Sequence, residues 1–161
     1  MNIFVLDKDP VLAAQMQCDK HVVKMVVESG QMLSTAHRLL DETVDDAFYK
    51  VAHKGHPCTL WTMRSNNNYN WHYIHFMALC REYTHRYGKI HKTQERLGSL
   101  LLIPPRNIAI GHFTPQPLAM KANPECMDPN DVVGSYRKFY MTKQARMPMV
   151  WTKREVPEWF R

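Results

Sequence analysis

Four polar side chains with the chemistry of an active site recur along one predicted helix of this sequence. They are an imidazole, an amine, a carboxylate and an amide, spaced three or four residues apart. At ~100° per residue they fall within a sector of roughly 80° on one side of the helix. A carboxylate near an amine and an imidazole can move protons or stabilise developing charge. The four residues are His21, Lys24, Glu28 and Gln31, and Arg38 lies just beside the same sector.

The rest of that helix argues against an ordinary solvent-facing stripe. Apolar side chains such as Val22, Met25 and Leu33 cover most of the other directions, so the helix is expected to be buried on nearly all sides. A carboxylate in such surroundings needs a nearby cation to balance its charge. We therefore predict an active or binding site that contains Glu28, with a structural salt-bridge network as the alternative.

Two further segments carry groups that suit nucleic acid. Amides alternate with aromatic rings over residues 65–71, which suits hydrogen bonds to base edges and stacking, although helix capping and core packing explain the same residues equally well. Cations alternate with aromatic rings over residues 136–161, a pattern expected of a nucleic-acid contact, but aromatic side chains also anchor tails to cores. The candidate contacts are Asn67 and Trp71 in the first segment and Arg137, Lys138, Lys143, Trp151, Lys153 and Arg154 in the second.

The sequence predicts no metal site and no cofactor site. His53, His56 and Cys58 could in principle bind zinc, but a zinc site needs a second spaced pair of ligands, which the sequence lacks. A histidine before a proline fits a helix cap in a loop instead, because proline pushes the preceding residue out of helical geometry. No glycine-rich phosphate-binding loop is present.

The elements that must position these side chains are helices. Asp9 and Pro10 supply an N-cap carboxylate and a proline at the first helical position, so a short helix begins there. A long aromatic-rich helix ends at Gly88, a natural C-terminal stop. A cap at residues 128–130 is expected to begin the last helix. The first predicted helix begins at about residue 10 and ends at a break at 17–19, and the second runs from that break to about residue 40. Ordered structure resumes near residue 58 after a loop. The remaining predicted helices cover about 65–87, 94–102 and 132–140.

The chain is predicted to be all-α and to form one domain that spans residues 1–161, a length that suits a single hydrophobic core. A short extended segment, residues 1–6, precedes the helices. A long proline-rich loop runs from residue 104 to residue 129, and loops of this length tend to be functional or mobile. A basic, aromatic C-terminal tail follows at about 143–161.

Composition limits the compartment and the partners. No run of eighteen apolar residues could span a membrane, and the apolar start lacks the basic residues and cleavage site of a signal peptide. The four separated cysteines are interpreted as reduced thiols. We therefore expect a cytoplasmic protein without a membrane partner. Lysine and arginine outnumber the acids by 21 to 15, and the net charge of +6 favours a polyanionic partner.

Taken in order, these features resemble the pyrimidine-dimer DNA glycosylase family, the phage endonuclease V type and its bacterial relatives. Members carry a histidine seven residues before a catalytic glutamate on one helix, as His21 and Glu28 stand here. No single motif is diagnostic, and the likeness lies in their order along the chain. The other matching features are the opening Met1–Phe4, the turn Asp9-Pro10, the loop His56-Pro57 leading to Trp61, Glu82 before the ending Arg86-Tyr87-Gly88, His91 beyond it, and the basic aromatic tail.

The resemblance implies a monomeric DNA glycosylase without a cofactor that removes a damaged or modified pyrimidine from duplex DNA, after the nucleotide is exposed from the stack. In that family the chain's own terminal amine attacks the sugar carbon of the damaged nucleotide, a glutamate assists, and the resulting imine permits strand cleavage. The resemblance thus implies Glu28 as the catalytic carboxylate and Met1 as the nucleophile. The other implied site residues are His21 as a catalytic partner and Lys24, Gln31, Arg38 and His56 as substrate contacts.

Two departures from the family pattern leave more than one function open. The phage enzymes expose a small residue after methionine removal, whereas Met1 followed by Asn2 is a poor substrate for that trimming, so Met1 is expected to remain. Val27 replaces the arginine before the family glutamate, which removes a contact and leaves the identity of the base open. Glu28 could then activate water without an imine. The sequence is also compatible with an enzyme that cleaves the N-glycosidic bond of free nucleotides, or with a non-catalytic, phage-type nucleic-acid-binding protein.

Overall fold

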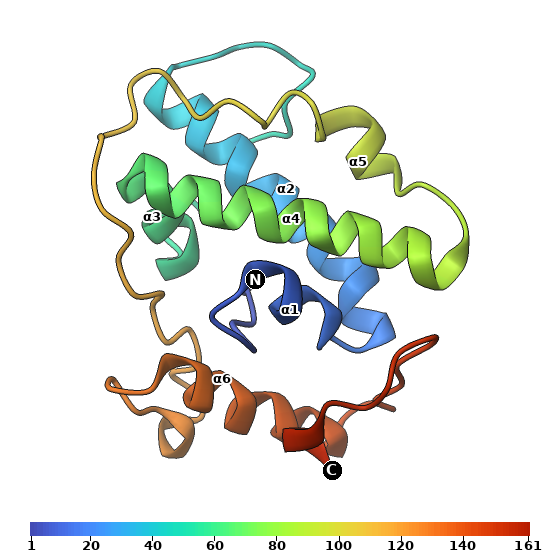
Figure 1. Ribbon diagram of the computed structural model, residues 1–161. Helices are drawn as coiled ribbons and strands as arrows, with labels where there is room; N and C mark the ends of the chain where they lie inside the picture. The colour runs from blue at the N-terminus through green and yellow to red at the C-terminus, as the bar shows by residue number, and fades with distance from the viewer.

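The computed structural model describes residues 1–161 and contains helices but no β-strand, which confirms the all-α prediction. The extended N-terminal segment and the long connection before the last helix are both present (Figure 1). The helices are α1 (Pro10–Gln15), α2 (Asp19–Leu40), α3 (Pro57–Arg64), α4 (Asn66–Tyr87), α5 (Lys92–Leu97) and α6 (Val132–Met141), with short 3₁₀ helices η1 (Pro124–Cys126), η2 (Thr142–Ala145) and η3 (Glu158–Phe160).

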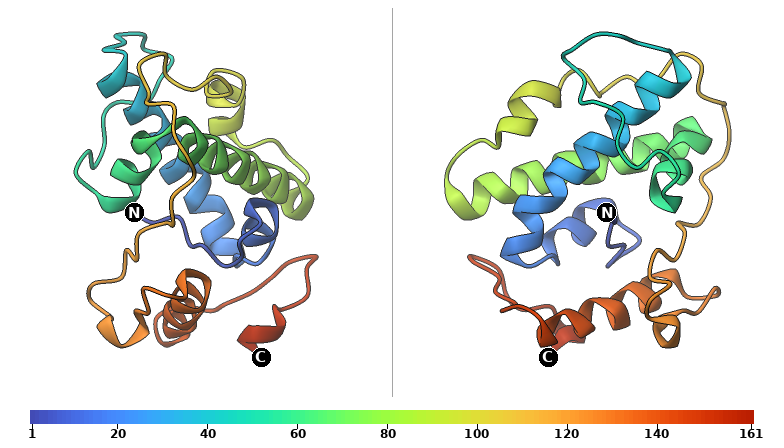
Figure 2. Two further views of the ribbon diagram at one scale, coloured as in Figure 1. Left: turned by 60° about the vertical axis from the view of Figure 1, so that its left-hand side comes forward. Right: turned by 180° about the vertical axis from the view of Figure 1, so that it is seen from behind.

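The two long helices, α2 and α4, cross at the centre of the molecule, and α1 and α3 pack against them (Figures 1 and 2). The N-terminal segment runs between this helix pair and α6, which closes the lower side of the molecule in Figure 1. Ile3, Val5 and Leu6 are at most 1% exposed. The first residues of the chain therefore lie inside the molecule, between α2 and α6.

Side chains at the helix ends explain most of the boundaries. Asp9 Oδ1 accepts the amide hydrogens of Val11 and Leu12 at 2.7 and 3.2 Å and so begins α1. His56 Nδ1 accepts the amide hydrogen of Cys58 at 3.1 Å and caps α3. Gly88, with φ of 71°, ends α4 in the left-handed region, where a glycine adds no Cβ strain. Each of these ends was expected from local sequence.

Two of the predicted boundaries are wrong. The last helix is capped by Asp131, whose Oδ1 accepts from Gly134 at 2.8 Å, because Asp128 instead accepts the amide hydrogen of Asn130 at 2.9 Å in the preceding turn. The predicted helix over 94–102 begins at residue 92 and ends at 97. His91 Nδ1 accepts the amide hydrogen of Thr93 at 3.1 Å and starts it two residues early.

Helix α2 is less enclosed than its apolar sequence indicates. α3, α4 and α5 pack against it, but no element covers the side that carries Val23, which is 38% exposed. Its middle does make a close approach, since a Cβ on Gly30 would lie 2.9 Å from Thr93 Cγ2 and 3.0 Å from Leu97 Cδ1. Glycine at that position thus allows α5 to touch α2.

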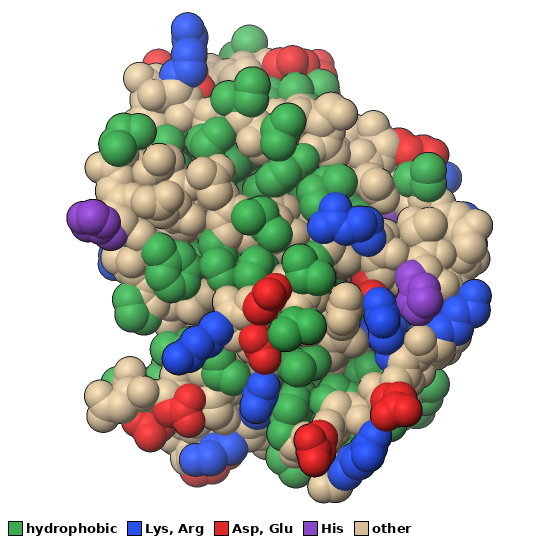
Figure 3. Space-filling view, in the orientation of Figure 1, with side chains coloured by type: hydrophobic (Ala, Val, Ile, Leu, Met, Phe, Trp, Pro, Cys, Tyr) green, Lys and Arg blue, Asp and Glu red, His purple; other side chains and the backbone are tan.

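The surface shown in Figure 3 is apolar at its centre, over α4, and towards the connection that runs past the start of α4, with charged side chains gathered mainly around the lower half. Exposed apolar residues of these elements include Ile74, Ile110 and Phe113. None of the helices is both long and apolar enough to cross a membrane.

Candidate active site

The carboxylate of Glu28 meets the first residues of the chain. Its Oε2 lies 3.6 Å from the amine nitrogen of Met1 and accepts the amide hydrogen of Asn2 at 3.2 Å. Its Oε1 lies 3.4 Å from Lys24 Nζ, one helical turn earlier. Only 13% of the Glu28 side chain is exposed. A nearly buried carboxylate is therefore held between two amines.

A turn made by Asn2 aims the amine at this carboxylate. The side-chain oxygen of Asn2 accepts the amide hydrogens of Ile3 and Phe4 at 2.8 and 3.2 Å, and its amide nitrogen donates to the carbonyl of Ala119 at 3.0 Å. An asparagine that bonds to the backbone just after itself forms a tight turn. Asn2 is buried, so both ends of its side chain are fixed by the protein.

The ring of His21 lies beside this pair. Its Nδ1 is 2.7 Å from the hydroxyl of Tyr140, and Phe4 stacks on its face with 4.6 Å between ring centroids. Burial first, and then the positive charges of Lys143 and Lys24, lower the pKa of His21 from its ordinary value of 6.5 to about 4. The imidazole is therefore neutral near pH 7.

These groups line one small cavity. Met1, His21, Lys24 and Glu28 form one wall, and Ala119, Phe139 and Lys143 belong to the other, around a volume of about 220 Å³. Lys143 Nζ lies 4.1 Å from the centre of the Phe139 ring, in a cation–π contact.

A larger hollow of about 540 Å³ adjoins this cavity and shares Ala119, Phe139 and Lys143 with it. His56 and the cations Lys121 and Arg146 also line it. The pKa of His56 is lowered first by burial and then by the positive charge of the Met1 amine, so this ring also lies near the amine. The two hollows together form a polar recess with a cationic rim.

Two members of the predicted stripe lie outside this recess. Gln31 lines a separate hollow with Tyr49 and Arg96. The guanidinium of Arg38 donates to backbone carbonyls of the loop after α2, at Thr43, Asp45, Phe48 and Tyr49. Arg38 thus holds that loop in place.

The amide-rich start of α4 binds the chain itself. Asn67 donates to the carbonyl of Gly111 at 2.6 Å, and Asn68 exchanges hydrogen bonds with Thr114. Trp71 Nε1 donates to the carbonyl of Lys8 at 3.2 Å. These side chains fasten the proline-rich connection and the N-terminal segment to α4, and the structure does not bring Asn67 or Trp71 to the recess.

The predicted DNA contacts of the C-terminal region fall into two groups. Trp151 is 6% exposed and donates to the carbonyl of Met16, Arg154 makes two hydrogen bonds to Glu82, and Arg137 donates to the carbonyl of Leu6 and pairs with Asp7. These three anchor the tail and α6. The other three are Lys143, which lines the recess, and the exposed Lys138 and Lys153.

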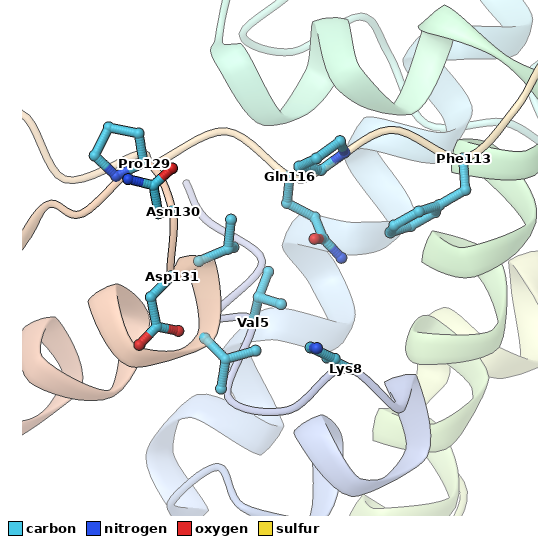
Figure 4. Close-up of a pocket in the computed structure, with 10 residues that line it drawn as sticks. Val5, Lys8, Phe113, Gln116, Pro129, Asn130 and Asp131 are labelled. Carbon is cyan, nitrogen blue, oxygen red and sulfur yellow. The ribbon is translucent and has the colours of Figure 1, made fainter.

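A second cavity of about 360 Å³ lies on the other side of the N-terminal segment (Figure 4). Val5, Lys8 and Phe113 line it, and the amide of Gln116 points into it. Phe4 lines the first cavity and Val5 the second, so the segment separates the two. None of the predicted catalytic residues reaches the second cavity, and we assign the candidate active site to the first.

Several residues of the recess were not expected from the sequence. Asn2 had one available signal, since asparagine is a common turn former. Ala119 had none, and Phe139 stood out only as one ring of the basic, aromatic segment 136–161, because the place of both depends on how α6 and the connection before it pack against residues far away in the chain.

Comparison with known proteins identifies one family. A family model described as pyrimidine dimer DNA glycosylase matches residues 1–95. The matched span contains Met1, His21, Lys24, Glu28 and His56, but not the wall of the recess made by residues 118–123 and α6. No curated protein and no solved structure matches the chain.

Proposed function

The chain belongs to the pyrimidine dimer DNA glycosylase family, and on that premise we propose that it removes a damaged or modified pyrimidine from duplex DNA and then cleaves the strand through an imine on Met1. The observation that carries the proposal is the 3.6 Å distance between the Met1 amine and Glu28 Oε2, beside a recess with a cationic rim. A nucleophilic amine needs a neighbouring base, and this pair provides one.

The chemistry follows from that pair. The uncharged amine attacks C1′ of the damaged nucleotide while the bond from C1′ to the base breaks, and the base leaves with the bonding electrons. Glu28 accepts the proton that the amine nitrogen releases. The C1′–O4′ bond then breaks, O4′ takes the proton that Glu28 holds, and the nitrogen lone pair forms a C=N bond between the Met1 nitrogen and C1′. Loss of a proton from C2′ then expels the 3′ phosphate by β-elimination, which cleaves the strand.

The rim of the recess supports binding of a DNA backbone. Lys24, Lys121, Lys143 and Arg146 surround the opening and can neutralise the phosphates that flank an extruded nucleotide. His56 lies between this rim and the amine. The protein's net charge of +6 favours the same partner.

The decisive experiment measures base release from duplexes that carry a pyrimidine dimer or a modified pyrimidine, with borohydride added to trap an imine. We expect a covalent adduct that mass spectrometry places on the Met1 nitrogen. Glu28→Gln should reduce base release by about a hundredfold or more, since a general base contributes at least this much. DNA affinity should stay unchanged. Glu95→Gln, at an exposed carboxylate of α5, is the matched control and should keep full activity.

The outcomes separate the candidate functions. Base release without a trapped adduct would exclude the imine mechanism and favour hydrolysis, in which Glu28 activates water. Release from free nucleotides alone would indicate the nucleotide-cleaving enzyme. No product from any substrate, with DNA binding unaffected by Glu28→Gln, would overturn the catalytic proposal in favour of a nucleic-acid-binding protein.

A further inference from the structure

The hydroxyl of Tyr140 connects α6 to His21 inside the protein. Tyr140 is completely buried, and its oxygen lies 2.7 Å from His21 Nδ1 and 2.8 Å from the backbone nitrogen of Cys18. The Cys18 N–H can only donate, so the hydroxyl oxygen accepts that hydrogen. The single proton of the hydroxyl is then free for another acceptor.

The best acceptor for that proton is His21 Nδ1. The thiol of Cys18 also lies beside the hydroxyl, but sulfur is a weak acceptor. A neutral imidazole that accepts at Nδ1 carries its own proton on Nε2. Phe4 stacks on the ring at 4.6 Å and Tyr140 meets it edge-on at 5.1 Å, so the ring plane is fixed as well.

The other nitrogen of His21 opens to the cavity. Nε2 makes no hydrogen bond within the protein, and the fully buried side-chain atoms without a partner are Gln17 Oε1 and Gln94 Oε1 only, so Nε2 keeps contact with the cavity that His21 lines. His56 has a parallel arrangement, because its Nδ1 accepts the amide hydrogen of Cys58 at 3.1 Å.

We propose that Tyr140 is a positioning residue that holds His21 with its proton on Nε2, as a hydrogen-bond donor from the cavity wall to an oxygen of the reacting nucleotide. The identity of that acceptor rests on the proposed function, whereas the position of the proton does not. A donor fixed in advance stabilises charge on the substrate without reorganising during the reaction. Tyr140 itself does not touch the substrate.

Nitrogen NMR of the free protein labelled with ¹⁵N-histidine at pH 7 tests the position of the proton. We expect the signal of a protonated nitrogen for His21 Nε2 and of an unprotonated one for Nδ1. In Tyr140→Phe the two shifts should move towards each other as both tautomers become populated. Tyr69→Phe is the matched control, because Tyr69 is equally buried and its hydroxyl contacts His37 Nε2 at 2.9 Å and the Leu101 carbonyl at 2.8 Å, away from the cavity.

A proton on Nδ1 in the unaltered protein, or an unchanged pattern in Tyr140→Phe, would overturn the proposal. Neither result depends on activity, so a failure of the proposed function would leave this measurement intact.

A double-mutant cycle tests the catalytic consequence. Tyr140→Phe should slow single-turnover base release by about tenfold and leave DNA affinity unchanged. This is less than the roughly hundredfold cost of losing an oriented donor outright, because the His21 ring stays in place. In His21→Gln, whose amide keeps a donor near the Nε2 position, the same change should have no further effect. If Tyr140→Phe slows base release equally in the unaltered protein and in His21→Gln, the hydroxyl only supports the fold and the positioning role is excluded.

Discussion

At the scale of single residues, one oxygen of Glu28 accepts the Asn2 amide hydrogen and also lies within ion-pair distance of the Met1 amine. The other oxygen faces Lys24. The carboxylate thus fixes the direction of the first peptide unit as well as the charge beside it. A group with two such roles needs its neighbours to be rigid, and Asn2 supplies that rigidity.

Asn2→Ala should therefore weaken imine formation while the protein stays folded. The change removes the two bonds to the backbone of Ile3 and Phe4 and the bond to Ala119, so the amine is no longer held at one place. Loss of orientation by about 1 Å can cost about a hundredfold in rate. We expect the rate of borohydride trapping to fall by at least tenfold with DNA affinity retained. An undiminished trapping rate would show that Glu28 alone orients the amine.

Asn70→Ala, at an exposed asparagine of α4 that makes no side-chain hydrogen bond, provides the comparison for that measurement and should trap at the normal rate.

The sequence grouped the helix-borne part of the recess and the resemblance added Met1 and His56, but nothing in the sequence pointed to Ala119. His21, Lys24 and Glu28 could be grouped because residues three or four apart on a helix share a side, which is a local rule. Ala119 reaches the recess, and Tyr140 reaches His21 behind it, only through the packing of α6 and its preceding connection, and spacing carries no information on such contacts. The same local rule grouped Gln31 with the stripe, although the structure turns it towards a different hollow.

At the scale of elements, a buried ion cluster fastens the C-terminal tail to the helices. Glu82 of α4 is 2% exposed and receives hydrogen bonds from Arg86 and from Arg154 of the tail. Arg86 also bonds to Asp19 at the start of α2, and Thr152 donates to the same carboxylate. Burial by itself would raise the pKa of Glu82, but the two arginines hold it below its usual value.

Replacing Glu82 with glutamine should release the tail and destabilise the protein. Removing one member of a buried ion pair leaves its partner's charge uncompensated, at a cost of about 3–5 kcal/mol. Urea unfolding should report this loss, and limited proteolysis should cut the tail first. Glu155→Gln breaks the exposed pair with Arg161 and should leave the unfolding midpoint unchanged. Equal stability of the two variants would mean that the cluster does not hold the tail.

The ends of the helices were easier to predict from the sequence than the burial and the contacts of their side chains. The caps at Asp9, His56 and Gly88 follow from the residue that stands at the end itself. The exposure of Val23 does not follow from local sequence, because a run of valines predicts burial whether or not another element covers it. The burial of Trp151 and the pairing of Arg154 likewise depend on where the tail is placed, and its basic, aromatic composition was compatible with an anchored tail and with a nucleic-acid contact alike.

At the scale of the whole molecule, buried histidines make stability depend on pH, and three of the four have strongly lowered pKa values. Burial lowers the pKa of His21 and His75 to about 4 and that of His72 to about 3, from an ordinary value of 6.5. The unfolded chain therefore binds protons between pH 6.5 and about 4 that the folded chain does not. The stability that these neutral rings provide is complete above pH 6.5 and is lost as the pH falls.

We expect the free energy of unfolding to drop by about 3 kcal/mol between pH 7 and pH 5.5, from about 1 kcal/mol for each of the three rings. Denaturant titrations at the two values measure it in a range where the carboxylates stay ionised. His72→Gln, which removes the ring between Thr62 and Ser29, should reduce the pH dependence, whereas the exposed His112→Gln should not. A flat profile for the unaltered protein would mean that these rings bind protons over the same pH range in the folded and the unfolded chain.

The walls of the recess come from distant parts of the chain, so their residues are synthesised at different times. During synthesis Met1, His21 and Glu28 leave the ribosome first, and Phe139 and Lys143 follow only after α3, α4 and α5 have been made. A nascent chain thus displays its amine and carboxylate before the cationic wall that would receive DNA exists. On the proposed function, a chain that ends before α6 would carry the amine and the carboxylate without Phe139, Lys143 and Arg146, and so without much of the surface that would hold DNA against them.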